Sequence, residues 1–163
     1  MRSFLLIFLF PISLFSEIKL IFFETQKADG SLVQFENEGR FTHMAVSYGD
    51  LWLHSHPYYG VEAVPFHQIQ KMGSKLTIVS LSTWKQFSEE EVLPYMGKKF
   101  DREFSWTDEK IYCSELIAKL LGIPPTPMFF HPDLWPSEYQ KLNGQPGTSP
   151  DDIFQWVNSQ PTQ

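Results

Sequence analysis

The sequence has 163 residues, of which 42% are hydrophobic and 20% are charged, so it fits one globular domain with a buried core. The formal net charge is −6 at pH 7 and no basic run occurs. This charge pattern excludes nucleic acid and anionic membrane surfaces as expected partners.

The first residues have the pattern of an export signal. Arg2 supplies a positive charge, residues 4–15 are mostly apolar, and Ser16 is a small residue suited to the position before a cleavage site. The apolar stretch is too short for a membrane-spanning helix, which needs about 20 apolar residues. We expect a signal peptide at 1–16, a single mature domain at 17–163 without a membrane span, and export to the periplasm or the medium. An uncleaved anchor or a buried first strand is the alternative.

Strands make up most of the predicted elements. A continuous apolar run predicts a buried strand at 18–23. Gly49-Asp50 separates two segments rich in β-branched, aromatic and aliphatic residues, and this pattern predicts a β-hairpin with a two-residue turn. The predicted strands are 18–23, a weak strand near 32–35, 41–48, 51–55 ended by Pro57, 61–66 and 76–81.

Helices are marked by signals at their ends. Ser88 and Glu91 form a capping-box pattern, and Gly122 follows the last apolar residue of a second helical segment. The predicted helices are 87–96, 114–121 and 151–157, the last capped by Pro150-Asp151, with proline-rich loops over 124–150. Helices combined with mostly antiparallel strands predict an α+β fold.

The predicted hairpin places histidines on one face. With Gly49-Asp50 as the turn, His43 lies opposite His56 and His54 opposite Ala45, and side-chain alternation puts all four on the same face. His43 and His54 are then diagonal neighbours, about 7–8 Å apart at the backbone, which is within reach of two imidazoles. Each histidine alone is explained as well by an ordinary surface or core role. Together they fit a base and its orienting partner, with His54 as the first candidate orienter and His56 as the reserve.

Cys113 is the single cysteine of the sequence, so it forms no internal disulfide. It stands at the start of a predicted helix, where the positive end of the helix dipole lowers a thiol pKa. Its neighbours Tyr112, Ser114 and Glu115 are polar, which favours a reactive thiol over a buried core cysteine. We expect Cys113 to be a nucleophile and His43 to be its base.

Several segments in a fixed order resemble a known family. Residues 41–46, Phe-Thr-His-Met-Ala-Val, followed by a hairpin and His56-Pro57, resemble the first half of the permuted NlpC-type papain-like cysteine hydrolases, the YiiX/YebB-like group. Residues 112–117, Tyr-Cys-Ser-Glu-Leu-Ile, resemble its nucleophile motif. Residues 95–101 and 149–153 are similar to its glycine-lysine-aromatic-aspartate and proline-aspartate elements.

The resemblance implies a circularly permuted papain-like fold of the α+β class, in which a small antiparallel sheet packs against a helix with the cysteine at its N-terminus. It assigns Cys113 as the nucleophile, His43 as the base and His54 as the third residue, where the group often has an acid. It implies an amidase, peptidase or acyltransferase that forms an acyl-thioenzyme without a cofactor. The implied substrates are peptidoglycan peptide amides or N-acyl lipids, and export favours the cell wall.

Two other functions fit the same residues. His54 and His56 have a spacing suited to two zinc ligands on a strand, with His43 or Cys113 as further ligands. A histidine in the third position also supplies no negative charge to steady an imidazolium. This departure leaves open a non-catalytic lipid- or cell-wall-binding module on the same fold.

Overall fold

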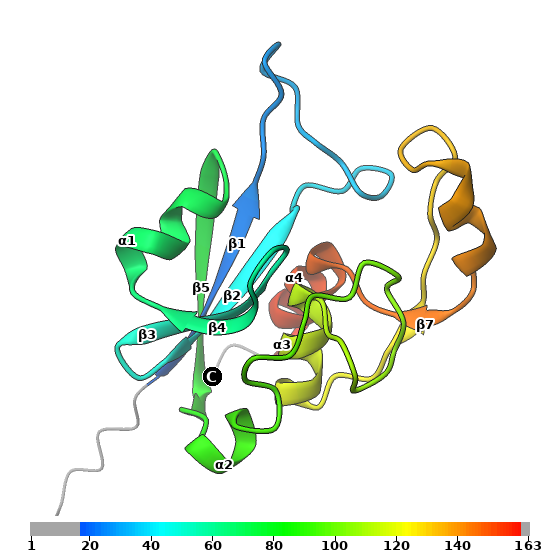
Figure 1. Cartoon of the computed structure of the whole chain (residues 1–163). Coiled ribbons are helices and arrows are strands. Elements are labelled where there is room, and N and C mark those ends of the chain that lie inside the picture. Colours follow the sequence, from blue (N-terminus) through cyan, green and yellow to red (C-terminus); the bar gives the residue numbers. More distant parts are fainter. Residues whose placement is uncertain (1–16, 161–163) are drawn as a thin grey trace, which may run out of the picture.

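The computed structural model describes residues 17–160 (Figure 1), and the predicted signal peptide at 1–16 lies outside the described residues. A five-stranded antiparallel sheet has the strand order β4-β3-β2-β1-β5. Its strands are β1 (Glu17–Glu24), β2 (His43–Tyr48), β3 (Leu51–His56), β4 (Gly60–Val64) and β5 (Lys75–Lys85). A two-stranded ribbon pairs β6 (Thr126–Pro127) with β7 (Pro146–Gly147).

Short helices surround this sheet. They are α1 (Phe66–Ile69), the 3-10 turn η1 (Gln70–Met72), α2 (Glu89–Val92), α3 (Cys113–Leu121), the 3-10 helix η2 (Ser137–Leu142) and α4 (Pro150–Ser159). None of the helices between residues 17 and 160 is long and apolar enough to cross a membrane. The mixed architecture confirms the predicted α+β class.

The predicted hairpin register is confirmed. β2 pairs with β3 through Val46 opposite Leu53 and Tyr48 opposite Leu51, which is the pairing that a two-residue turn imposes. Gly49 has a φ of 58°, a left-handed conformation that glycine adopts without the penalty of a side chain. The turn chemistry therefore fixes which face of the sheet each histidine occupies.

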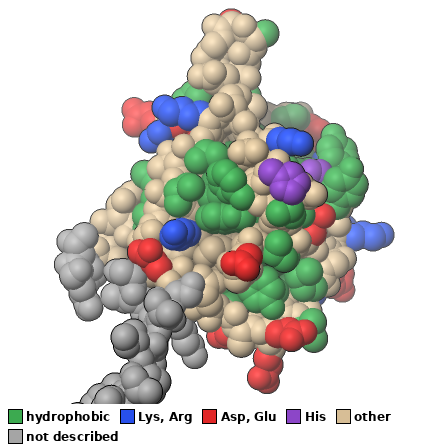
Figure 2. All heavy atoms as spheres, turned by 90° about the vertical axis from the view of Figure 1, so that its left-hand side faces the viewer, with side chains coloured by type: hydrophobic (Ala, Val, Ile, Leu, Met, Phe, Trp, Pro, Cys, Tyr) green, Lys and Arg blue, Asp and Glu red, His purple; other side chains and the backbone are tan. Residues whose placement is uncertain are grey.

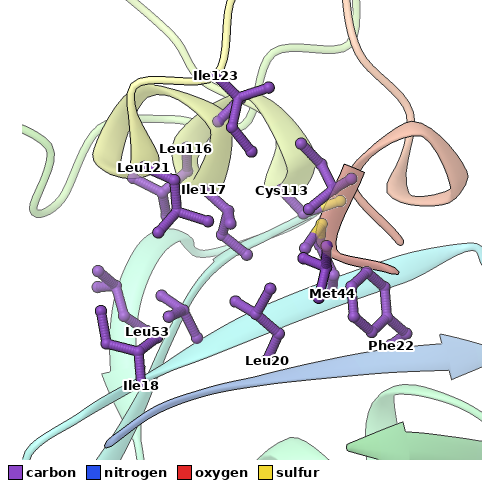
Figure 3. Packing of buried hydrophobic residues seen from close by; sticks show 14 of the residues in the cluster. Ile18, Leu20, Phe22, Met44, Leu53, Cys113, Leu116, Ile117, Leu121 and Ile123 are labelled. Atoms are coloured by element: carbon purple, nitrogen blue, oxygen red, sulfur yellow. The ribbon is translucent and has the colours of Figure 1, made fainter. Parts of the chain in front are cut away.

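The main core lies between the sheet and α3 (Figure 3). Leu116 and Ile117 of α3 are fully buried and belong to the same cluster as Leu20, Met44 and Leu53 of the sheet. Because this helix is apolar over most of its length, burial of its apolar side chains holds Cys113, its first residue, against β2.

A smaller cluster lies on the opposite sheet face. It contains Phe23, Ala45, Trp52 and Ile69, the last of which belongs to α1. Figure 2 views the molecule from the α1 side, where exposed hydrophobic side chains lie among acidic and basic ones. The sheet therefore has a core on each face, and the cysteine-bearing helix covers only one of them.

Three predicted elements differ from the structure. The segment near 32–35 forms only an isolated bridge between Gln26 and Leu32, and its Phe35 packs on Trp135 instead of joining the sheet. The helix predicted at 87–96 is helical only at 89–92, although its Ser88 capping box is present. The last helix is capped by Ser149, whose Oγ accepts a hydrogen bond from the Asp152 N–H, and not by Pro150-Asp151.

Candidate active site

Cys113 is the first residue of α3 and is 6% exposed. The preceding Tyr112 is extended, and the Glu115 side chain accepts a hydrogen bond from its N–H, which anchors the helix start. Figure 3 shows Cys113 beside Met44 of β2. The predicted placement of the cysteine at a helix N-terminus is confirmed, but the thiol is buried in the core cluster and its polar neighbours are buried as well, contrary to the expectation drawn from those neighbours.

The Cys113 thiol differs from expectation in its acidity. Burial raises its pKa to about 11, against smaller opposing effects of the backbone N–H groups of Met44 and Ser114. The prediction of a lowered pKa is therefore wrong, because desolvation of the thiolate outweighs the helix dipole and these hydrogen bonds. At neutral pH the group is therefore a neutral thiol and not a thiolate.

His43 and His54 form a buried pair, with exposed fractions of 5% and 1%. His43 Nε2 lies 2.9 Å from His54 Nδ1, so one imidazole donates a hydrogen bond to the other. Burial lowers the pKa of His43 well below its usual value, and the neighbouring imidazoles of His54 and His56 add to the effect. Burial and, less strongly, His56 lower the pKa of His54 to about 4. Both rings are therefore neutral at pH 7, as a proton acceptor must be.

His56 has a different role from the other two histidines. Its Nδ1 accepts hydrogen bonds from the backbone N–H groups of Tyr58 and Tyr59, at 3.0 and 3.3 Å. The ring also stacks on the Tyr59 ring with centroids 4.5 Å apart. His56 thus closes the β3–β4 turn, and His54 is the histidine that is hydrogen-bonded to His43.

Sequence reasoning missed one acidic side chain at this pair. Glu62 of β4 lies directly across from His54 in the sheet, and its Oε1 is 3.4 Å from His54 Nε2. The two atoms are within ion-pair distance but do not meet the geometry of a hydrogen bond. The pairing of 61–66 with 51–55 could have signalled this contact, but the loop between them has no two-residue turn pattern to fix the register.

Cys113 and His43 line the same cavity, whose volume is about 530 Å³. No hydrogen bond joins them within the described part of the chain. His43 is the first residue of β2, and its ring lies near that of Phe23, with centroids 5.9 Å apart. Since His43 Nε2 is hydrogen-bonded to His54, Nδ1 is the His43 ring nitrogen that this bond leaves unused. Catalytic hydrogen bonds are often long in a ligand-free site and tighten when substrate binds.

The rest of the cavity is strongly aromatic. Rings from the loop before α3 and from the segment between α3 and α4 form a connected set, in which Phe104, Phe130, Trp135 and Tyr139 pack edge-on or tilted with centroids 4.9 to 6.0 Å apart. The cavity wall includes Phe35, Phe100, Phe104, Tyr112, Pro127, Met128, Phe129, Phe130, Trp135 and Tyr139. Such a wall favours an apolar ligand.

One part of the cavity rim carries acidic groups. The Glu36 carboxylate accepts a hydrogen bond from Ser149 Oγ at 2.7 Å and shares this region with Asp151 and Asp152. Burial, together with the two neighbouring carboxylates, raises the pKa of Glu36 to about 7 even though the Ser149 bond opposes the shift. The loop that precedes β2 is therefore attached to the start of α4 through a carboxyl group that titrates near neutrality.

The fold and these side chains define a class of α+β proteins with a buried cysteine at a helix start, packed on an antiparallel sheet that carries a histidine pair. The amino-acid sequence matches no protein-family model and no curated protein sequence. The fold is similar to the crystal structure of the metalloprotein YiiX from Escherichia coli O157:H7, with a TM-score of 0.59. The two chains are 20% identical, and the match covers 85% of this chain and 91% of that one. The YiiX-like part of the expected resemblance is thereby supported at the level of the fold.

Proposed function

We propose that this protein is a thiol acyl hydrolase or acyltransferase of the permuted papain-like type, with Cys113 as nucleophile, His43 as base and His54 as orienter. The observation that carries the proposal is the shared cavity: Cys113 and His43 are both among the residues that line it, and the Nε2 of the His43 imidazole is occupied by His54. A periplasmic or secreted location, after removal of residues 1–16, belongs to the same proposal.

The proposed reaction begins with proton transfer. His43 Nδ1 takes the proton from the Cys113 thiol, and the sulfur forms a bond to the acyl carbon of the substrate. The bond from that carbon to the leaving amine or alcohol breaks, and the leaving group takes the proton from His43. Water, or a second acceptor, then attacks the thioester and restores the thiol. The N–H of Cys113 is the proposed donor to the oxyanion.

The raised thiol pKa and the lowered imidazole pKa support a neutral resting pair. Proton transfer and attack then occur together, as with a serine nucleophile, and not from a preformed thiolate–imidazolium pair. The low dielectric of the cavity strengthens the stabilisation of the oxyanion that forms.

The aromatic wall supports a substrate with an apolar acyl chain, an N-acyl or ester lipid, over a peptidoglycan peptide. The carboxylate groups of a peptidoglycan peptide call for cationic partners, and Arg102 is the one cationic side chain among the described residues that line the cavity. The cavity of about 530 Å³ lies within the usual range of small-molecule sites, about 300–1,000 Å³.

The decisive experiment exposes the protein to reactive acyl probes of two kinds, fatty-acyl esters and activated peptide amides. Mass spectrometry then identifies any acyl group on Cys113. We expect fatty-acyl transfer to Cys113 and none in a Cys113→Ser variant analysed for thioester. Peptidyl transfer instead would keep the thiol mechanism and change the substrate to a cell-wall fragment. If neither probe acylates Cys113, the proposal is refuted.

A variant pair tests the apolar wall separately. Phe129 lines the cavity and is 63% exposed, so Phe129→Ala removes a wall contact without opening the core. Tyr59 is 73% exposed and does not line the cavity, so Tyr59→Ala is a matched control. We expect Phe129→Ala alone to reduce the preference for long over short acyl chains. Equal effects of the two variants would contradict the role of the wall.

A non-catalytic lipid- or cell-wall-binding module is the second candidate. It is favoured by the raised pKa of the Cys113 thiol and by the missing hydrogen bond between Cys113 and His43 within the described residues. Binding of a fatty-acid probe by a Cys113→Ala variant, with full rescue of any deletion phenotype, would establish this function in place of catalysis.

Metal binding fits the residues poorly. YiiX is called a metalloprotein, and the spacing of His54 and His56 predicted two zinc ligands. Between residues 17 and 160, however, no three His, Cys, Asp or Glu side chains are grouped so that they could hold a metal ion. His43 and His54 are hydrogen-bonded to each other, and His56 Nδ1 accepts hydrogen bonds from backbone N–H groups. No step of the proposed reaction passes through a metal.

A further inference from the structure

Glu62 is an acidic side chain at the far end of the histidine pair. It belongs to β4, is one third exposed, and approaches the fully buried His54 from the neighbouring strand. It touches neither Cys113 nor the cavity wall. Any effect on the thiol must therefore pass through His54 and His43.

Three observations connect Glu62 to the pair. The strands place His54 directly opposite Glu62, so the two side chains lie on the same sheet face. Glu62 Oε1 lies 3.4 Å from His54 Nε2. Within the described residues this nitrogen has no hydrogen-bond partner, although it is buried. A buried ring nitrogen without a partner is costly, and a small rotation of the Glu62 side chain supplies one.

The protonation state of the two rings makes this contact consequential. A neutral imidazole carries one N–H, which is on either Nδ1 or Nε2. If His54 carries the hydrogen on Nε2, its Nδ1 is bare and accepts a hydrogen bond from His43 Nε2–H. His43 Nδ1 is then also bare and can accept a proton. If His54 carries it on Nδ1, the order reverses, and His43 Nδ1 bears a hydrogen and cannot take the thiol proton.

We infer that Glu62 is a positioning residue that selects the Nε2–H tautomer of His54 and, through it, the Nε2–H tautomer of His43. A carboxylate only accepts hydrogen bonds, so it requires a hydrogen on the nitrogen that faces it. The inference rests on the proposed function only in what it says of the thiol, because the tautomers exist whether or not catalysis occurs. Glu62 supplies through His54 the negative charge that a histidine in the third position lacks.

Long-range nitrogen NMR of the protein labelled with ¹⁵N-histidine tests this directly, since a protonated ring nitrogen and a bare one resonate far apart. The wild type is compared with Glu62→Gln, which keeps an acceptor oxygen, and with Glu62→Lys, which offers only donors. Glu90→Lys has the same charge change on exposed α2 and serves as the control. Acylation of Cys113 by the fatty-acyl probe is measured on the same samples.

We expect Nε2–H on both His43 and His54 in the wild type, in Glu62→Gln and in Glu90→Lys. Glu62→Lys is expected to move the hydrogen to Nδ1 on both rings. Acylation is then expected to slow by about 10²–10⁴-fold, the range seen when a histidine base is lost or held in the wrong tautomer. A wild-type His54 with Nδ1–H, or unchanged tautomers in a folded Glu62→Lys, overturns the inference. If Glu62→Lys does not fold, the wild-type tautomers decide. Absence of acylation in the wild type refutes the proposed function alone.

Discussion

The acidity of Cys113 can be measured because it is the single cysteine of the chain. Its pKa is raised to about 11 in the folded protein, against an ordinary value of 9.0. Two pKa units mean that the native protein holds about a hundredfold less thiolate than the unfolded chain at pH 7 to 8. Since the thiolate is the species that reacts, iodoacetamide should label the native protein about a hundredfold more slowly than the same protein in urea.

The pH dependence separates this reasoning from simple shielding of the thiol. Rates of alkylation, followed by mass spectrometry, are expected to rise about tenfold per pH unit up to pH 10 in the native protein and to level off near pH 9 in urea. A thiol that is merely inaccessible would instead level off at the same pH in both states. A native rate that is already constant below pH 8 would refute the neutral resting pair, because it would indicate a thiolate stabilised by an imidazolium.

Two further predictions concern stability. The folded-state pKa of Glu36 is raised from 4.5 to about 7, so its contribution to stability is complete below pH 4.5 and is lost as the pH rises through 7. Glu36→Gln should therefore melt at a higher temperature than the wild type at pH 8 and at the same temperature at pH 4.5, with Glu38→Gln of the same loop as control; an equal gain at both pH values would contradict this. Gly60 has a φ of 78°, and an added Cβ would lie 2.1 Å from the Lys98 carbonyl oxygen. Urea unfolding should show that Gly60→Ala lowers the free energy of unfolding by more than the about 1–3 kcal/mol that a strained backbone costs. The control is Gly30→Ala, because Gly30 has a φ of 84° but no atom within 4 Å of an added Cβ, and it should lose less. Equal losses in the two variants would mean that the Lys98 contact relaxes freely.

The parts of the site that follow local rules were predictable from the sequence. The turn at Gly49-Asp50 fixes the hairpin register, and the register alone brings His43 and His54 together. The apolar pattern of residues 114–121, ended by Gly122, likewise predicts α3, and with it the place of Cys113. In each case a few neighbouring residues decide the geometry.

The parts that depend on distant packing were not predictable. The helix position of Cys113 is visible in the sequence, but the burial that raises its pKa comes from β2 and could not be read from neighbours. Glu62 was missed because the turn from Pro57 to Tyr59 gives no register for β4. The aromatic cavity wall combines segments far apart in the chain, such as Phe35 and Trp135, whose rings lie 5.1 Å apart.

The separation of the site into a local hairpin and a distant helix has a consequence for folding. His43 and His54 belong to one hairpin, a unit that forms in about 1–10 μs. Cys113 joins them only after α3 closes a long loop and docks on the sheet, and contacts of large sequence separation form slowly. During refolding, loss of thiol reactivity should therefore lag behind formation of the β2–β3 hairpin. The lone thiol reports the docking of α3, the step that turns a folded sheet into a complete site.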